Sequence, residues 1–379
     1  MKILGINISH DTSVAGVTDG HIDFVHDEAR FRRAKYWDPG KMTEDDNGLL
    51  CIERHNLRDN DHVIYASFDR RVLEFECDKD KLVFDRLKAE EFCKDVSAMQ
   101  LTRDRLDLLQ EKYKDEGFIY KEKDHHNDAE IIAKIDDQLG IDQHVFIPEH
   151  HLYHAECVHR LSPWKDEECI AIVWDGGGCQ PYWDTHPGFQ EMETIYHCVP
   201  GKEPKKVWQR LSNSRMLSEW GWTWPNHTFD CLWCYEDEVQ EKDGIELIFS
   251  SKPSSGMNFS HMSLAFGCDE EGRAAGKVMG MASYGRTSPN VFNQYSVAQQ
   301  CEEEALTNSL NIINKAKQLV PNTNKILLSG GYSLNCTNNY KYLEANPDYE
   351  FFVDPIPHDG GTALGACIWL QRNLEEDAK

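Results

Sequence analysis

Two glycine-paired junctions near the end of the chain constrain the fold more than any other feature. The apolar run Lys325–Leu328 ends in the segment Ser329–Gly331, and a second junction, Pro357–Gly361, has Asp359 before two glycines. Glycine adopts positive φ without a Cβ clash, so backbone N–H groups at such turns approach an anion, and a following helix adds its positive end. Either turn alone is typical of any α/β fold. Two of them, each leading into a helix, predict an α/β protein that binds phosphate.

Composition narrows the function classes. The chain has 379 residues, 40% of them hydrophobic, and 40 Lys+Arg against 65 Asp+Glu give a net charge of −25. Such a surface repels polyanions, so no extended nucleic-acid surface is expected and a small-molecule substrate fits better. No apolar run is long enough for a membrane span, and Met1–Gly5 leads directly into a strand-like pattern. We therefore expect a cytoplasmic protein with no membrane partner.

The cysteines favour a reducing compartment. There are 13 at scattered spacings, which is typical of buried free thiols rather than a disulfide framework. Cys231 and Cys234 have CxxC spacing with His227 nearby. Without a second such pair, they are a weak zinc signal.

The chain contains one coarse duplication. Lys2–Ile8 and Cys169–Trp174 are apolar runs that end in polar tips, and each continues as a hairpin. In the first, Asp19-Gly20 is a type I′ turn signal between Ser13–Thr18 and His21–His26. A further strand is predicted at His62–Phe68, and helices are predicted at Glu28–Tyr36, Lys79–Glu116, Asn127–Leu139, Glu302–Leu319 and Thr362–Gln371.

This order suggests two similar lobes with a nucleotide in the cleft between them. We expect the first lobe at 1–165 and the second at 166–379, with a boundary near Pro163–Glu168. An irregular, tryptophan-rich insertion is expected at about 213–260.

Two histidines provide a metal signal. If a helix begins near His150, then His150 and His154 are i and i+4 on one face and reach a single cation, whereas His151 points away. Histidine pairs on helices are also often solvent-facing or satisfied in a core. With the carboxylate of Asp359, they form a set suited to Fe(II), with Zn or Mn also acceptable.

Seven segments, in order, resemble the nodulation- and antibiotic-type O-carbamoyltransferases, a family related to the enzymes that make threonylcarbamoyladenosine in tRNA. They are 5–17 (GINISHDTSVAGV), 28–35 (EARFRRAK), 150–156 (HHLYHAE), 173–178 (VWDGGG), 276–285 (GKVMGMASYG), 327–336 (LLSGGYSLNC) and 357–366 (PHDGGTALGA). The resemblance extends from about Lys2 to Trp369.

The resemblance implies a two-lobed actin/Hsp70/sugar-kinase-like fold, a ribonuclease H-like duplication with a nucleotide cleft. It also implies transfer of a carbamoyl group from carbamoyl-adenylate, made from ATP and carbamoyl phosphate, to a substrate hydroxyl beside a bound iron. The implied metal ligands are His150, His154 and Asp359. The implied catalytic residues are His10, Asp11 and Lys35. The implied nucleotide-binding residues are Asp175, Gly176, Gly177, Gly276, Lys277, Gly330, Gly331 and Asn335.

Members of that family continue into a C-terminal domain that makes the carbamoyl-adenylate. Because this chain reaches Lys379 directly after the last helix of the transfer module, we expect that domain to be absent and a separate adenylating protein to deliver the activated group. The tryptophans of the insertion, which equally suit a small core of their own, are a candidate docking surface for it: Trp220, Trp222, Trp224 and Trp233.

The roles of single residues leave alternatives open. Asp11 or His10 is the candidate base, although His10-Asp11 also fits a turn in which the aspartate caps its own backbone. Lys35 ends a run of four cations in six residues, Arg30–Lys35, which suits an adenylate or a phosphorylated acceptor but equally a solvated helix face.

Two other function classes compete with a transferase. A sugar-kinase-like or ATP-hydrolysing enzyme would use the phosphate turns but not the histidine pair. A non-catalytic nucleotide-binding partner would retain the fold alone. The acceptor hydroxyl is open, because a sugar, an antibiotic or a hydroxymethyl group on a nucleobase all fit.

Overall fold

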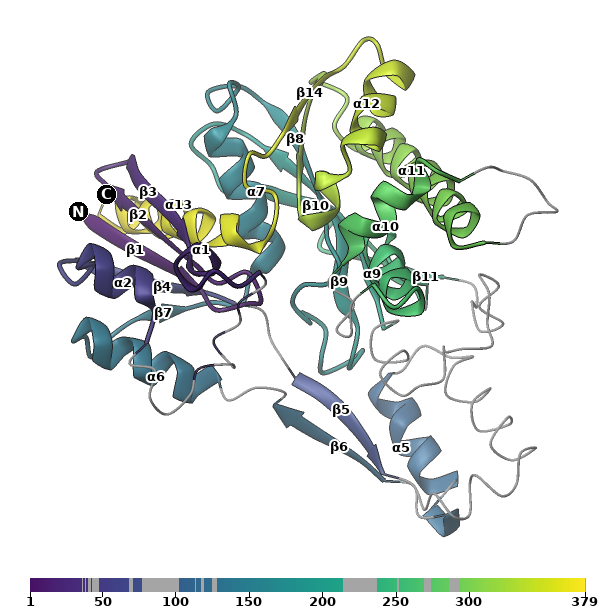
Figure 1. Ribbon diagram of the computed structural model, residues 1–379, viewed down its shortest axis with the longest axis horizontal. Helices are drawn as coiled ribbons and strands as arrows, with labels where there is room; N and C mark the ends of the chain where they lie inside the picture. The colour runs from purple at the N-terminus through teal and green to yellow at the C-terminus, as the bar shows by residue number, and fades with distance from the viewer. Residues whose placement is uncertain are drawn as a thin grey trace.

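Two separate β-sheets form the framework of the molecule (Figure 1). The computed structural model describes residues 1–35, 37, 39, 42, 48–67, 71–76, 102–112, 114–116, 119–124, 128–213, 237–250, 252–268, 274–285 and 293–378. The described residues also include a small two-stranded ribbon. In it, β5 (Arg71–Glu76) and β6 (Ile119–Asp124) pair in antiparallel fashion. The predicted zinc-type cysteines and the four insertion tryptophans lie outside the described residues.

The first sheet has the strand order β3-β2-β1-β4-β7. Its hairpin strands are antiparallel, and β4 and β7 continue parallel to β1. The strands are β1 (Lys2–Asn7), β2 (Ser13–Thr18), β3 (His21–Asp27), β4 (His62–Ala66) and β7 (Val145–Phe146). Successive residues face opposite sides of the sheet. Leu4 and Ile6 therefore pack toward α2 (Leu50–His55) and α6 (Asp128–Leu139), and Ile3 packs in a second core.

The second sheet repeats this arrangement. Its order is β11-β12-β10-β9-β8-β13-β14, with β8, β9 and β10 antiparallel and β13 and β14 parallel to β8. The strands are β8 (Cys169–Trp174), β9 (Gln190–Cys198), β10 (Lys205–Ser212), β11 (Glu238–Lys242), β12 (Ile245–Ser250), β13 (Lys325–Ser329) and β14 (Glu350–Val353). The predicted duplication is thus confirmed at the level of strand order.

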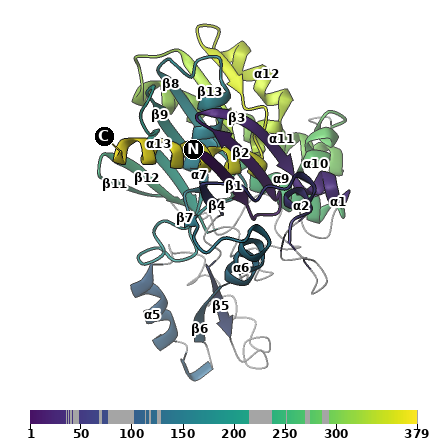
Figure 2. The same ribbon diagram turned by 90° about the vertical axis from the view of Figure 1, so that its left-hand side faces the viewer.

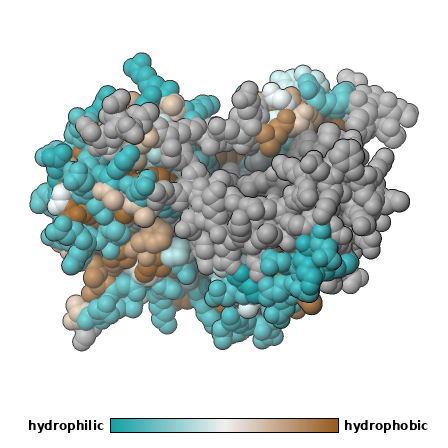
Figure 3. Space-filling model, turned by 90° about the horizontal axis from the view of Figure 1, so that it is seen from below, coloured by the Kyte–Doolittle hydropathy of each residue, from teal (hydrophilic) through white to brown (hydrophobic). Residues whose placement is uncertain are grey.

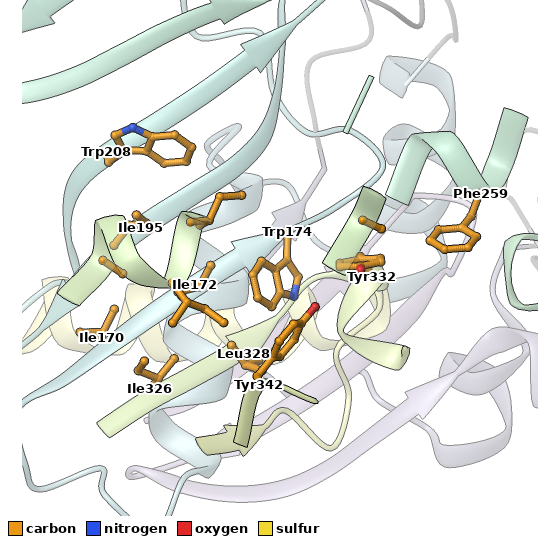
Figure 4. Packing of buried hydrophobic residues seen from close by; sticks show 14 of the residues in the cluster. Ile170, Ile172, Trp174, Ile195, Trp208, Phe259, Ile326, Leu328, Tyr332 and Tyr342 are labelled. Carbon is orange, nitrogen blue, oxygen red and sulfur yellow. The ribbon is translucent and has the colours of Figure 1, made fainter. Parts of the chain in front are cut away.

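One face of this sheet is covered by helices. Ile170, Ile172 and Trp174 alternate along β8 and pack in one core with residues from the helices and from β13 (Figure 4). The helices on this side are α9 (Ser255–Ala265), α10 (Ala275–Ala282), α11 (Gln294–Leu319) and α12 (Cys336–Ala345). The alternate residues Ala171 and Val173 face the other side, in a core that includes Leu152 and Val158 of α7 (His150–Leu161).

Two helices connect the sheets by crossing from one half of the chain to the other. Helix α7 packs on β8, β9 and β13, whereas α13 (Thr362–Asp377), near the C-terminus, packs on β1, β2 and β4. The two helices also pack on each other, and Figures 1 and 2 show them together between the sheets. A Cβ at Gly365 of α13 would lie 1.9 Å from the carbonyl oxygen of Tyr153 in α7, so only glycine permits this approach.

Several predicted elements differ in extent from the observed ones. The helix expected over Glu28–Tyr36 is α1 (Glu28–Arg32), because Arg33 adopts a left-handed conformation (φ 54°) and ends it. The expected type I′ turn is confirmed, with positive φ at both Asp19 and Gly20. Of the long helix expected over 79–116, the described part contains α5 (Arg103–Lys112) and the 3-10 turn η2 (Lys114–Glu116).

Of the predicted insertion at about 213–260, the structure describes residue 213 and the ranges 237–250 and 252–260. That part is regular rather than irregular, because β11 and β12 add to the sheet beside β10 and α9 follows them. The division of the chain into units at 1–165 and 166–379 stays a prediction. Its boundary falls in the connection between α7 and β8.

The face of the molecule seen from below is mainly polar where it is described (Figure 3). Viewed from below, hydrophilic residues predominate among the coloured atoms, with apolar residues gathered in patches on the side of the first sheet (Figure 3). In the part of the chain that the structure describes, no helix has the length and apolar character needed to cross a membrane.

The contact between α7 and α13 leads to a prediction about stability. Gly365→Ala forces a methyl group into the backbone of Tyr153, so we expect a loss of about 1–3 kcal/mol in the free energy of unfolding, or more. Gly280→Ala is the matched control, since Gly280 also lies in a helix and its Cβ position is open. The control should be neutral or stabilise by up to about 1 kcal/mol. Chemical denaturation measures both, and equal stabilities would contradict this packing.

Candidate metal centre

The first turn of α7 contributes two histidines to a buried cluster. The helix begins at His150, after Pro148-Glu149, so His150 and His154 lie on one face. Their rings are 4.7 Å apart with an interplanar angle of 87°. Both side chains are almost fully buried, at 1% and 0% exposure. His151 points elsewhere, as expected, and its Nδ1 lies 2.7 Å from Thr194 Oγ1.

Two aspartates complete the cluster from opposite directions. Asp175 follows the last residue of β8, and Asp359 begins the 3-10 turn η4 (Asp359–Gly361) that leads into α13. His150 Nε2 lies 3.1 Å from Asp175 Oδ2 and 3.5 Å from Asp359 Oδ1. His154 Nε2 lies 4.0 Å and 3.9 Å from the same two oxygens. The four ligand atoms lie within 4.8 Å of one another.

This geometry fits a metal ion. Ligand atoms bound at about 2.0–2.2 Å from one ion lie about 3–4.4 Å apart, as most of these atoms do. His154 Nε2 is buried and has no hydrogen-bond partner among the described residues, and 3.9 Å is too long for one. Two nitrogens and two carboxylate oxygens suit Fe(II), Zn or Mn.

The histidine and the two aspartates of the cluster shift one another's pKa values. Burial lowers the pKa of His150, but Asp359 and Asp175 outweigh this effect and raise the pKa to about 10. Burial also acts to raise the pKa of Asp359, yet His150 and His10 hold it well below its usual range. For Asp175, burial and Asp359 are outweighed by His150, and its pKa is lowered. A proton on His150 thus neutralises part of the carboxylate charge before a cation binds.

The predicted catalytic pair lies beside the cluster. His10 Nδ1 is 3.5 Å from Asp359 Oδ2, the oxygen that faces away from the histidines of α7, and His10 Nε2 is 3.6 Å from Asp11 Oδ2. His10 is 41% exposed, so this side of the centre is open to solvent. Burial raises the pKa of Asp11, although His10 opposes the effect. His358 Nδ1 approaches the same Asp11 oxygen at 3.6 Å.

Glycines of the predicted phosphate and nucleotide turns contact the metal-type cluster. Asp175 Oδ1 accepts hydrogen bonds from the backbone N–H of Gly176 at 2.8 Å and of Gly331 at 3.2 Å. Gly330 has φ +86°, and a Cβ there would lie 2.3 Å from the carbonyl oxygen of Trp174. A Cβ at Gly177 would meet Gln190. Gly330 is thus required by the packing of β8 against β13, and the amides of Gly176 and Gly331 hold a cluster carboxylate.

The other predicted nucleotide residues belong to helices on one face of the second sheet. Gly276 and Lys277 lie in α10, where Lys277 Nζ donates to the carbonyl of Cys268 at 3.0 Å. Asn335 caps α12 by accepting from Asn338 N at 3.2 Å, and its amide donates to Glu302 at 2.9 Å. Both ends of the Asn335 side chain therefore have protein partners. The nucleotide roles of these residues stay predictions.

The basic run differs from the expected helix face. Lys35 is exposed and lies beyond the end of α1. Arg32 is structural, because its Nε lies 2.9 Å from buried Glu28 and its guanidinium stacks over Trp37. A catalytic role for Lys35 also stays a prediction.

Asp175 is expected from the sequence among the nucleotide-binding residues, whereas in the structure it lies with the metal-type ligands. A signal was present, because Asp175 and Asp359 are each followed by two glycines. Ser329 and Asp354 were not singled out as neighbours of the cluster. Ser329 Oγ lies 3.3 Å from His154 Nδ1 and donates to Asp354 Oδ2 at 2.7 Å.

Comparison with known proteins gives a short sequence match and broad structural matches. No model of a known protein family matches the sequence. A curated relative, the nodulation protein NolNO of Sinorhizobium fredii, is 39% identical over 54 residues, which are 14% of this chain and 8% of that protein. This chain therefore matches only a small part of that relative.

Two solved structures superpose on nearly the whole chain. Full-length HypF in a phosphate- and nucleotide-bound form has a TM-score of 0.50 at 14% identity, covering 99% of this chain and 56% of HypF. HypF of T. kodakarensis has a TM-score of 0.50 at 11% identity and covers 99% of this chain and 48% of that one. At these identities the likeness concerns the fold alone. Together with the repeated strand order, it establishes the two-lobed actin/Hsp70/sugar-kinase-like α/β fold.

The cluster predicts metal binding that depends on α7. Purified protein should contain about one equivalent of a transition metal, and His154→Ala should lose it. His159→Ala is the matched control, because His159 is also a buried histidine of α7 but does not belong to the cluster. Elemental analysis gives the occupancy, and a fully loaded His154→Ala protein would refute the site.

The raised pKa of His150 predicts that metal binding releases a proton. Because that pKa is about 10, the proton must leave at neutral pH, and the apparent affinity should rise with pH by about tenfold per unit. Calorimetry in buffers of different ionisation enthalpy measures the proton release. An affinity that does not change between about pH 6 and 9 would show that His150 is already neutral before the ion binds, which contradicts the raised pKa.

Proposed function

We propose that this protein is a carbamoyltransferase, which moves a carbamoyl group from carbamoyl-adenylate to a hydroxyl of a small molecule or modified nucleotide. The proposal is supported chiefly by one observation: a buried His150/His154/Asp175/Asp359 cluster with an acid–base pair, His10 and Asp11, beside it. A sugar kinase of this fold has no need of the histidine pair. The match to a nodulation protein agrees with the resemblance to nodulation-type O-carbamoyltransferases.

In the proposed reaction, the acceptor oxygen forms a bond to the carbamoyl carbon. The bond from that carbon to the adenylate oxygen breaks, and AMP leaves with the electron pair. The hydroxyl proton passes to Asp11 or His10. Burial raises the pKa of Asp11, which makes this carboxylate a better proton acceptor than an exposed one. When bound, a divalent ion, iron by family resemblance, would supply Lewis acidity and a fixed template.

The protein's own residues would mainly orient the two substrates. His10 lies between Asp359 and Asp11. It would therefore fix the position of the candidate base relative to the metal-type ligands. Gly176 has no atom within 4 Å of its Cβ position, which leaves the turn after Asp175 accessible to a phosphate. The Gly331 amide already bonds to Asp175. We therefore assign the adenylate phosphate to the turn at Gly176.

The test is direct. The protein is incubated with ATP, carbamoyl phosphate and a panel of hydroxyl compounds, and mass spectrometry follows the carbamoyl mass increment. Pyrophosphate release in the same mixture shows whether this chain makes the adenylate. Release without any partner would remove the need for a separate adenylating protein. Acceptor phosphorylation instead of carbamoylation would favour the kinase class, and nucleotide binding without turnover would favour a non-catalytic partner.

Asp11→Asn gives a prediction for the base. If Asp11 accepts the hydroxyl proton, the rate of carbamoyl transfer should fall by about 10²–10⁴-fold, while metal content stays unchanged because Asp11 does not belong to the cluster. Asp348→Asn, an exposed aspartate of the second half, is the control and should keep full activity. An Asp11→Asn protein with wild-type rates would leave His10 as the base.

A further inference from the structure

The side chain of Ser329 lies between a histidine of the metal centre and a buried carboxylate. Its Oγ donates to Asp354 Oδ2 at 2.7 Å and lies 3.3 Å from His154 Nδ1. All three residues are buried, with Ser329 and His154 at 0% and Asp354 at 2% exposure. A serine hydroxyl has one proton to donate. The position of that proton decides what the histidine does.

Asp354 draws the hydroxyl proton toward itself. Its Oδ1 accepts the backbone N–H of Ile356 at 2.9 Å, and its Oδ2 accepts from Ser329. Both oxygens thus act as acceptors, as in an ionised carboxylate. The lone pairs of Ser329 Oγ then face His154 Nδ1, so this nitrogen must be the donor. A neutral imidazole that bears its proton on Nδ1 has its lone pair on Nε2.

His154 Nε2 is the atom that faces the cluster, and within the described residues it has no hydrogen-bond partner of its own. Among the described residues, the hydrogen bond that acts on its tautomer is therefore the one at Nδ1. We propose that Ser329 and Asp354 are positioning residues of the metal centre, which hold a proton on His154 Nδ1 and present the Nε2 lone pair to the ion. This inference rests on the metal centre of the proposed function but not on carbamoyl transfer.

The same segment orients a second ligand. Two residues after Ser329, the Gly331 N–H bonds to Asp175 Oδ1. Asp354 also begins the connection that leads to Asp359. The end of β13, which the sequence indicated as a phosphate turn, thus contacts ligands from α7 and β8. Hydrogen bonds to the remote atom of a ligand typically account for about 10–100-fold in metal affinity.

The first test is the affinity of the purified full chain for Zn(II), measured by competition with a chelator. Ser329→Ala removes the acceptor for His154 Nδ1, and we expect binding weaker by about 10–100-fold. Ser263→Ala is the matched control, because Ser263 is fully buried but bonds only to the carbonyl of Ser260 in its own helix. Its Zn(II) affinity should equal that of the wild type.

Asp354→Asn is a sharper test, because it should reverse the proton order. The asparagine oxygen must face the Ile356 N–H, so its amide donates to Ser329 Oγ, and the hydroxyl then donates to His154 Nδ1. The proton moves to Nε2 and blocks the ligand position. Zn(II) should therefore bind Asp354→Asn at least as weakly as Ser329→Ala.

Nitrogen NMR of histidine-labelled, metal-free protein reads the tautomer directly and separates this role from a general loss of packing. The expected result is a proton on His154 Nδ1 in the wild type and a shift of that proton to Nε2 in Asp354→Asn. Wild-type Zn(II) affinity in both variants, or an Nδ1 lone pair in the wild type, would overturn the inference. A wild type that binds Zn(II) tightly and follows these patterns but transfers no carbamoyl group would refute only the proposed function.

Discussion

The close approach of α7 and α13 is the contact on which the rest of the molecule depends. At Gly365 one helix backbone lies directly against the carbonyl of Tyr153 in the other. The first turn of α7 contains His150 and His154, and the turn before α13 contains Asp359. Crossing the helices at their beginnings therefore brings ligands from the two halves of the chain within reach of one ion, while each helix covers the opposite sheet.

Much of this arrangement could be predicted from local patterns. Continuous apolar runs in Lys2–Asn7 and Cys169–Trp174 indicated the central strands of both sheets, and Asp19-Gly20 indicated the hairpin turn. The spacing of His150 and His154 placed both on one helix face, which the structure confirms. Such features depend on period and turn chemistry within a few residues, and so they are visible without knowledge of the tertiary contacts.

The parts that could not be predicted depend on partners far away in the chain. The paired glycines at Gly330 and Gly331 predict a phosphate site, which stays a prediction. Their pattern did not indicate that Gly330 makes room for Trp174 or that Gly331 bonds to Asp175. Asn335 is likewise predicted to bind the nucleotide, and its sequence position did not indicate that its side chain bonds to α11 and α12. Glycine and asparagine suit both uses, and only the packed structure shows which neighbours they have.

The pairing of α13 with the first strands also has a consequence for how the chain folds. Asn7 donates to the carbonyl of Asp359, 352 positions later, and Ser13 donates to Gly360. The apolar face of β1, β2 and β4 that α13 covers is thus made early in synthesis, and its burial is completed when the far end of the chain arrives. Long-range closure of this kind is slow. During translation this apolar face of the first sheet stays exposed until α13 has been made. It is therefore the surface that a chaperone would protect.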